Sequence, residues 1–89
     1  MILIVDSGST KTDWIAIDNQ GNEVFETRTL GLNPTMLSNE ILNERIRNNF
    51  DIYNNRDKVK KIYFYSAGLG VDSTKQRILK VFKSIFKNS

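Results

Sequence analysis

Seven residues near the N-terminus, 6–12, combine the groups that bind phosphate and magnesium ions in proteins. Asp6 ends an apolar run, where a carboxylate is costly without a partner such as a hydrated cation. Gly8 allows a tight turn and a close approach of the backbone to a bulky anion. The amides around Ser9 and Thr10 can form a concave nest of donors for phosphate oxygens. The run therefore predicts a phosphate-binding loop.

The remaining side chains of this loop fit the same interpretation. The hydroxyls of Thr10 and Thr12 add donors, and Lys11 adds a positive charge. The loop is not a Walker A motif, because G-x-x-x-x-G-K-[ST] is absent and the residues lie in a hairpin. The alternative is an ordinary hairpin turn with Asp6 on the surface. The position directly after a fully apolar strand favours phosphate binding.

Composition excludes several kinds of chemistry. The chain has 89 residues, enough for one domain or part of one, and is 39% hydrophobic and 26% charged, as in ordinary globular proteins. Cysteine and histidine are absent, which excludes disulfides, cysteine nucleophiles and the common zinc sites within these residues. Acid–base chemistry would therefore rest on carboxylates.

Charge and hydropathy indicate which partners to expect. The net charge is +3, and the cations of residues 75–87 alternate with apolar positions at helical spacing. This pattern is typical of a solvated helix face, so we expect no nucleic-acid partner. No apolar run approaches the roughly 20 residues that span a bilayer, and the first residues lack the basic region of a signal peptide. We expect a cytoplasmic protein without a membrane partner.

Three strands are predicted in the first thirty residues. Residues 2–5 are uniformly apolar, which predicts a strand buried on both faces. Residues 12–18 are apolar on both faces as well, and residues 19–22 form a hairpin turn signal. Residues 23–29 alternate more clearly, which favours the edge of the sheet. Residues 1–30 are therefore predicted to form an antiparallel meander that contains the phosphate-binding hairpin.

A crossover helix and a fourth strand are predicted over residues 38–66. Ser38 is a candidate N-cap of a helix that extends to Phe50. Leu42 and Ile46 share one face of this helix with Phe50. Residues 61–66 form the fourth strand, and the crossover places that strand parallel to the first.

A last helix over residues 73–87 completes the predicted architecture. Asp72 or Ser73 caps it, and its core face consists of Ile78, Phe82, Ile85 and Phe86. We expect Trp14 in the core, and packing contacts for Tyr63, Phe64 and Tyr65. The order β-β-β-α-β-α with a mixed sheet matches the opening of an α/β, ribonuclease-H-like fold. Its fourth strand would be an open edge.

Three motifs resemble those of a known family. The string Asp-x-Gly-x-Thr-x-Thr over residues 6–12 resembles the first phosphate motif of the actin-like ATPase superfamily. With Asp13 and Trp14 it resembles the N-acetylglucosamine kinase-like members of the group that also contains the activator ATPases of benzoyl-CoA reductase. Residues 31–34 (Gly-Leu-Asn-Pro) and 65–70 (Tyr-Ser-Ala-Gly-Leu-Gly) resemble two further segments of these kinases. The resemblance covers the whole chain.

The resemblance implies an ATP- and Mg²⁺-dependent sugar kinase, with N-acetylglucosamine as the expected acceptor. It implies that Asp6 orients Mg²⁺ through water and that residues 8–12 hold the phosphates. Asn33 and Gly68 would border the sugar. It also implies that the chain is the N-terminal part of the enzyme. The catalytic Asp, the second phosphate motif and the adenosine pocket are expected beyond Ser89, so we expect the chain alone to be inactive.

Some features depart from the family pattern, and alternatives stay open. Ser7 and Ser9 stand where many relatives have Gly, which narrows the loop but adds hydroxyls. Asn33 before Pro34 can also be a simple turn residue. An activator-type ATPase is the second enzyme candidate, although its iron–sulfur cluster needs cysteines that these residues lack. A non-catalytic fragment, whose open edge pairs with a second copy in a homodimer, is the candidate from another class.

Overall fold

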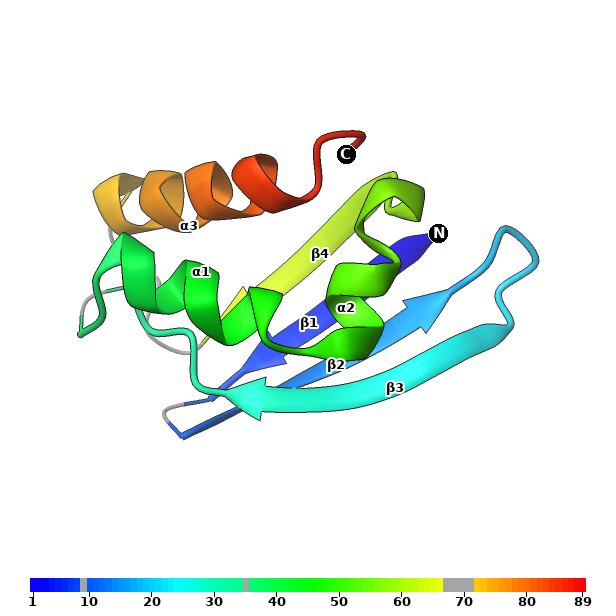
Figure 1. Ribbon diagram of the computed structural model, residues 1–89, viewed down its shortest axis with the longest axis horizontal. Coiled ribbons are helices and arrows are strands. Elements are labelled where there is room, and N and C mark those ends of the chain that lie inside the picture. Colours follow the sequence, from blue (N-terminus) through cyan, green and yellow to red (C-terminus); the bar gives the residue numbers. More distant parts are fainter. Residues whose placement is uncertain (9, 35, 67–71) are drawn as a thin grey trace.

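The computed structural model describes residues 1–8, 10–34, 36–66 and 72–89, which form a mixed α/β fold (Figure 1). The elements, in chain order, are β1 (Ile2–Ser7), β2 (Lys11–Ile17), β3 (Glu23–Leu30), α1 (Asn39–Arg47), α2 (Phe50–Asn54), a 3₁₀ turn (Arg56–Lys58), β4 (Lys61–Ser66) and α3 (Asp72–Ile85).

The sheet has the strand order β3-β2-β1-β4, so β1 lies inside it and β4 at its edge. β1 pairs antiparallel with β2 and parallel with β4, and Val5 lies opposite both Trp14 and Phe64. These pairings confirm the predicted fold class, the central first strand and the parallel crossover. The bounds of β4 agree with the predicted residues 61–66.

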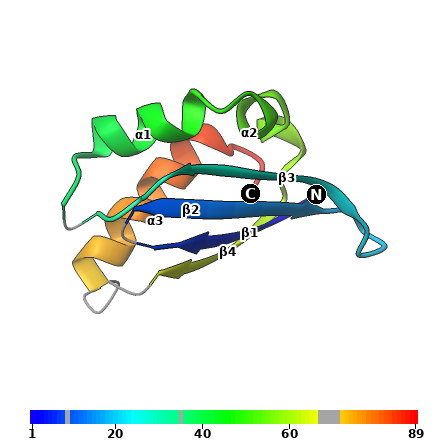
Figure 2. The same ribbon diagram turned by 90° about the horizontal axis from the view of Figure 1, so that it is seen from below.

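Only one face of the sheet is covered by helices. Figures 1 and 2 show α1, α2 and α3 on the same side of the strands. On β1, Leu3 and Val5 are fully buried beneath the helices, whereas Ile2 and Ile4 are only partly buried on the opposite face. The prediction that residues 2–5 are buried on both faces is therefore wrong for the described residues, because successive side chains point to opposite faces.

An aromatic cluster forms the centre of the core. Phe82 of α3 packs edge-on against Trp14 and Phe64, with ring centroids 6.2 and 5.3 Å apart. The Trp14 indole donates a hydrogen bond to the Thr29 hydroxyl (3.0 Å), which satisfies its polar group. Trp14 is fully buried, as predicted.

The two tyrosines of β4 differ from the prediction. Tyr63 and Tyr65 are 41% and 59% exposed on the uncovered face, so they do not pack in the core, and the alternative of packing at an interface stays a prediction. Phe64, between them, faces the core and packs against it. The alternation of side chains along the strand separates the three aromatic residues.

The predicted crossover helix is interrupted. Ser38 caps α1 by accepting a hydrogen bond from the Ile41 amide (3.3 Å), as expected. However, Asn49 has an extended backbone and caps α2 by accepting from the Ile52 amide (3.1 Å). Ile52 is therefore buried, and Phe50, which was predicted to face the core, is 76% exposed. Asn49 also donates to the Thr27 hydroxyl (2.9 Å), which ties the break to β3.

Helix α3 has the predicted core face. Ile78, Phe82, Ile85 and Phe86 are buried, and Val81 is buried beside them. Among residues 1–8, 10–34, 36–66 and 72–89, no helix has the length and apolar character needed to cross a membrane.

The hairpin between β2 and β3 is built around Asp18 and Gly21. Gly21 has a φ of 83°, a left-handed conformation that glycine adopts without strain. The Asp18 carboxylate accepts hydrogen bonds from the Gln20 and Asn22 amides, both at 2.9 Å. The bond from Asn22 is the main reason why the pKa of Asp18 is lowered from its ordinary value.

The lowered pKa of Asp18 predicts a pH dependence of stability. A carboxylate with a lower pKa in the folded chain stabilises the fold above its unfolded pKa, and this contribution is lost as the pH falls through the folded pKa. We expect wild type to be more stable than Asp18→Asn at neutral pH. The difference should shrink as the pH falls from the ordinary value of 3.8 through the lower pKa of the folded chain. Urea unfolding of both chains at about pH 7 and about pH 2.5 measures it. A constant difference would contradict the prediction.

Candidate functional site

The three predicted ligand-binding segments begin at the same end of the sheet. β1, β3 and β4 run in the same direction, and their arrowheads in Figure 1 lie at one end. β1 leads into the hairpin of residues 8–11, β3 into the segment with Asn33, and β4 into residues 67–71. Ser66, the last residue of β4, lies in register with Ser7. Gly68 lies outside the described residues. The topology therefore gathers motifs that are far apart in the sequence.

Asp6 is exposed on the uncovered face of the sheet. Its side chain has no hydrogen bond or ion pair among the residues that the structure describes. Asp13, opposite Asp6 in the register, is instead paired with Arg28 at 2.7 Å. Asp6 therefore presents a carboxylate that is accessible to a ligand.

A hollow of about 450 Å³ adjoins Asp6 on this face. It is lined by apolar side chains of the central strands and by charged side chains of β2 and β3, together with one tyrosine: Ile4, Asp6, Asp13, Ile15, Glu26, Arg28 and Tyr65. The described residues contain no group of three or more metal-ligating side chains. A Mg²⁺ ion at Asp6 would therefore draw its other ligands from water or phosphate.

Gly8 is not required by the backbone of the hairpin. Its amide donates to the Lys11 carbonyl (2.8 Å), so this amide closes the turn and is not free for a phosphate. Gly8 has no positive φ, and a Cβ added there would lie 3.5 Å from the Lys11 carbonyl oxygen, an ordinary contact. The fold thus tolerates a side chain at this position. Open space beside the backbone is what glycine provides here.

The tip of the hairpin is exposed. The side chains of Thr10 and Lys11 both reach solvent. Ser9, between Gly8 and Thr10, lies outside the described residues. The Thr10 carbonyl accepts a hydrogen bond from the Gly31 amide (3.0 Å). This bond places the start of the segment that carries Asn33 against the phosphate-binding hairpin.

Two buried hydroxyls connect the hairpin to the same segment. The Ser7 and Thr12 hydroxyl oxygens are 2.9 Å apart, and both residues are almost fully buried. The Thr12 hydroxyl donates to the Leu30 carbonyl (3.2 Å), and the Leu32 amide donates to the Ser7 hydroxyl (3.1 Å). Each hydroxyl has one proton, so Ser7 must donate to Thr12. The four groups form one directed chain from Leu32 to Leu30.

This chain of hydrogen bonds changes the expected roles of Ser7 and Thr12. Thr12 was predicted to offer its hydroxyl to a phosphate, but the residue has no exposed surface and its hydroxyl is bonded inside the protein. The Ser7 hydroxyl likewise faces inward. The alternation of side chains could have indicated this, because Ser7 shares a strand face with Leu3 and Val5.

Asn33 is half-buried at the centre of the segment between β3 and α1. Its carbonyl accepts hydrogen bonds from the Met36 and Leu37 amides, both at 3.1 Å. Asn33 therefore has the turn role that was considered as an alternative. Its predicted contact with a sugar stays a prediction.

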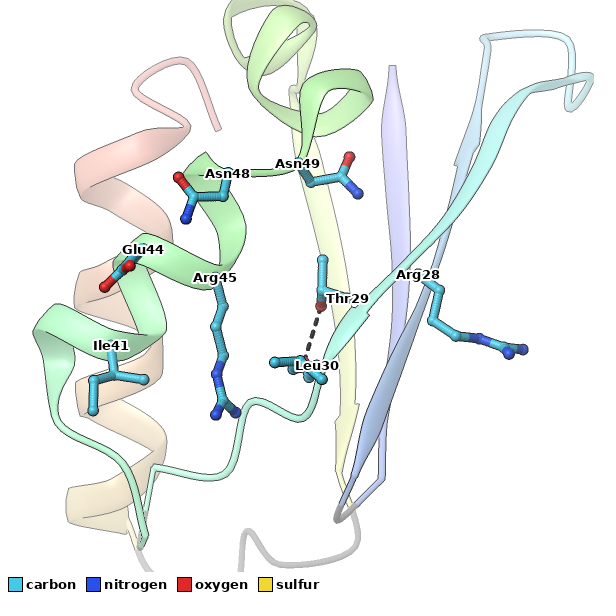
Figure 3. A pocket seen from close by; sticks show the side chains of 8 residues that line it. All are labelled: Arg28, Thr29, Leu30, Ile41, Glu44, Arg45, Asn48 and Asn49. Atoms are coloured by element: carbon cyan, nitrogen blue, oxygen red, sulfur yellow. Dashed lines mark hydrogen bonds between the residues drawn. The ribbon is translucent and has the colours of Figure 1, made fainter.

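Two arginines that were not predicted hold this segment. Arg45 of α1 donates to the Gly31 carbonyl, and Figure 3 shows its side chain extending from the helix toward the chain after Leu30. Arg77 of α3 donates to the Pro34 and Leu37 carbonyls. From the sequence, Arg77 was predicted to be one of the cations of a solvated helix face. Its neighbours in the sequence carry no signal for contacts with residues about 40 positions away.

A separate pocket of about 380 Å³ lies between β3 and α1. Its lining comes from the outer side of β3 and from α1 and the residues after it: Arg28, Thr29, Leu30, Ile41, Glu44, Arg45, Asn48 and Asn49 (Figure 3). None of the predicted site residues lines it. The pocket is therefore distinct from the phosphate-binding hairpin.

Comparisons with known proteins support a kinase-like fold. A crystal structure described as that of a candidate N-acetylglucosamine kinase from Porphyromonas gingivalis matches the chain with a TM-score of 0.85 and 29% sequence identity. The match covers 99% of this chain and 31% of that protein, so the chain spans about a third of its length. No protein-family model matches the chain, and no significant match is found among curated proteins.

The buried hydroxyl chain predicts a defined loss of stability on substitution. Ser7→Ala leaves the Leu32 amide without its acceptor. Thr12→Val leaves the buried Ser7 hydroxyl without its acceptor and removes one of the two hydroxyl donors to the Leu30 carbonyl. We expect each variant to lower the free energy of unfolding by about 1–3 kcal/mol, because a buried polar group loses its partner. Urea denaturation of the 89-residue chain measures this loss.

Thr29→Val is a change of the same kind, because it leaves the indole of fully buried Trp14 without its acceptor. We expect it to lower the free energy of unfolding by a similar amount. Stabilities of Ser7→Ala and Thr12→Val that equal wild type would contradict the directed chain of hydrogen bonds.

Proposed function

We propose that the chain supplies the first phosphate-binding loop of an ATP-dependent sugar kinase, with N-acetylglucosamine as the acceptor. The observation that carries the proposal is the arrangement of residues at the hairpin end of the sheet. There Asp6 is exposed and has no partner among the described residues, Gly8 is a glycine that the fold does not require, and the segment with Asn33 is hydrogen-bonded alongside. The similarity to the candidate N-acetylglucosamine kinase of P. gingivalis supports the choice of reaction and sugar.

The exposed residues have distinct roles in this proposal. Asp6 orients a hydrated Mg²⁺ ion, and Gly8 leaves room for the phosphates beside the backbone. Ser9, Thr10 and Lys11 contact phosphate oxygens, whereas Thr12 supports the loop from inside. When bound, Mg²⁺–ATP supplies the phosphoryl group and the cation that offsets its charge. Transfer of this group depends mainly on positioning and charge stabilisation.

The acceptor side is formed by the neighbouring segments. Asn33 borders the sugar, and Gly68 borders it from the segment after β4. The hydrogen bond between Gly31 and Thr10 keeps the Asn33 segment next to the hairpin. This proximity of donor and acceptor sites is what a phosphotransferase needs.

The catalytic carboxylate and the adenosine pocket belong, in our proposal, to the rest of a longer protein. We therefore predict that the 89-residue chain alone phosphorylates no N-acetylglucosamine, as measured by coupled detection of ADP. Sustained ADP production that Asp6→Ala abolishes would show that the catalytic carboxylate lies within these residues.

The exposed loop residues should govern activity in the complete kinase, meaning the longer chain that the proposal requires. We expect Asp6→Asn and Thr10→Ala each to reduce kcat/KM by at least about 10-fold, since losing a charge-assisted contact costs about 1.5–3 kcal/mol. Thr10→Ser should retain more activity than Thr10→Ala, because it keeps the hydroxyl. Asp18→Asn, at the far end of β2, is the control and should have little effect.

A matched pair of glycine substitutions separates the site from the fold. Gly8→Ala should keep the stability of wild type, because the added Cβ meets only an ordinary contact, yet it should lower kcat/KM at least about 10-fold by occupying phosphate space. Gly21→Ala should destabilise the chain by about 1 kcal/mol, because its φ is left-handed, and should leave kcat/KM unchanged. Steady-state kinetics and thermal unfolding measure both. A fully active Gly8→Ala enzyme would indicate an ordinary hairpin.

A further inference from the structure

We infer that Arg77 is a positioning residue for the acceptor sugar, because it fixes the segment of residues 33–37 against α3. This inference rests on the proposed function, in which Asn33 borders the sugar. Arg77 lies on the second turn of α3, far from the segment in sequence. It makes no hydrogen bond to the described residues of the hairpin.

The guanidinium of Arg77 binds three acceptors on this one segment and the start of α1. It donates from Nη2 to the Leu37 carbonyl (2.8 Å), from Nη1 to the Pro34 carbonyl and from Nε to the Asn39 side-chain oxygen (3.1 Å). These acceptors lie 38 to 43 residues before Arg77. Pro34 follows Asn33 directly, so this clamp acts next to the proposed sugar contact.

The chemistry of arginine suits this arrangement. A planar guanidinium offers five donors in fixed directions and can serve three acceptors at once. Bonds from a charged donor are stronger than neutral ones, and Arg77 is partly buried. Lysine carries the same charge on a single nitrogen without this fork. Arg77→Lys should therefore restore little of the clamp.

The other end of the segment is held by different groups. The Thr10 carbonyl and the Arg45 guanidinium bind Gly31, and the Ser7 hydroxyl binds the Leu32 amide. Asn33 lies between these contacts and the Arg77 clamp. Loss of Arg77 therefore frees the segment on the far side of Asn33, while the hairpin and Leu32 stay in place. The structure assigns Arg77 to the acceptor side of the site.

The packing of α3 does not depend on Arg77. The helix buries Ile78, Val81, Phe82 and Ile85 against the sheet, and the Ser84 hydroxyl accepts a separate hydrogen bond from Asn43 (3.2 Å). Loss of Arg77 should therefore leave α3 docked. This separation makes a positioning role distinguishable from a purely structural one.

Steady-state kinetics of the complete kinase test the role in sugar binding. We expect Arg77→Met, which keeps the apolar stem, to raise KM for N-acetylglucosamine at least about 10-fold and to change KM for ATP less than about 2-fold. Arg77→Lys should resemble Arg77→Met. The matched control is Lys80→Met, one turn further along α3, where an exposed lysine has no hydrogen-bond or ion-pair partner among the described residues; it should match wild type. Equal increases in KM for ATP and for N-acetylglucosamine, or full activity of Arg77→Met, would overturn the inference.

Hydrogen exchange of the 89-residue chain gives a readout that does not depend on activity. The Met36 and Leu37 amides bond to the Asn33 carbonyl, and Arg77→Met should speed their exchange at least about 10-fold, with β1 and α3 unchanged. Unchanged exchange at both amides would overturn the clamp itself. Faster exchange throughout α3 would show a structural role and also overturn the inference. A third outcome is also informative. If Arg77→Met speeds exchange only at these two amides, but the complete protein binds no sugar, the proposed function is overturned and the acceptor role of Arg77 with it.

Discussion

The bonded pair of Ser7 and Thr12 hydroxyls lies on β1 and β2 and links these strands to the segment that carries Asn33. Both hydroxyls are buried, so each must find partners inside the protein. They find them in the backbone of Leu30 and Leu32, at the point where β3 ends. Because neighbouring side chains on a strand point to opposite faces, the inward position of Ser7 also requires Asp6 to face outward. One buried contact thus accounts for the support of the loop and for the exposed carboxylate.

The segment between β3 and α1 owes its shape to side chains and not to regular secondary structure. The Asn33 carbonyl closes its turn, Arg45 and Arg77 donate to carbonyls of its backbone, and its Leu32 amide donates to the Ser7 hydroxyl. Binding residues often lie on segments that a rigid scaffold positions in this way. Our proposals divide the site accordingly, with phosphate contacts on the hairpin and the sugar contact on the segment.

The two glycines on hairpins show how a fold requirement differs from a ligand requirement. Gly21 has a backbone conformation that other residues adopt only with strain, so the turn itself explains it. Gly8 has no such conformation and would tolerate a side chain within the chain's own structure. The space beside Gly8 adjoins the exposed Thr10 and Lys11. Under the proposed function, a bound anion explains why glycine occupies this position.

Local pattern in the sequence was sufficient for most elements of the fold. The apolar run of residues 2–5, the turn at Gly21 and the Ser38 cap depend on residues close together in the chain, and the structure contains each of them. The prediction of one helix through Phe50 was wrong, because Asn49 is held by a hydrogen bond to Thr27 on β3. That contact spans 22 residues and leaves no periodic signal.

The sequence by itself also determined the predicted phosphate-binding motif, since its residue types and their order lie within seven positions. Only the tertiary structure decided which of those residues are exposed. It turned Thr12 inward through its bond to Ser7, and it pairs Asp13 with Arg28 while Asp6 has no partner among the described residues. It alone identified Arg77, whose acceptors lie about 40 residues away. The physical reason is that hydrogen bonds depend on distance in space, which the spacing of residues along a chain does not specify.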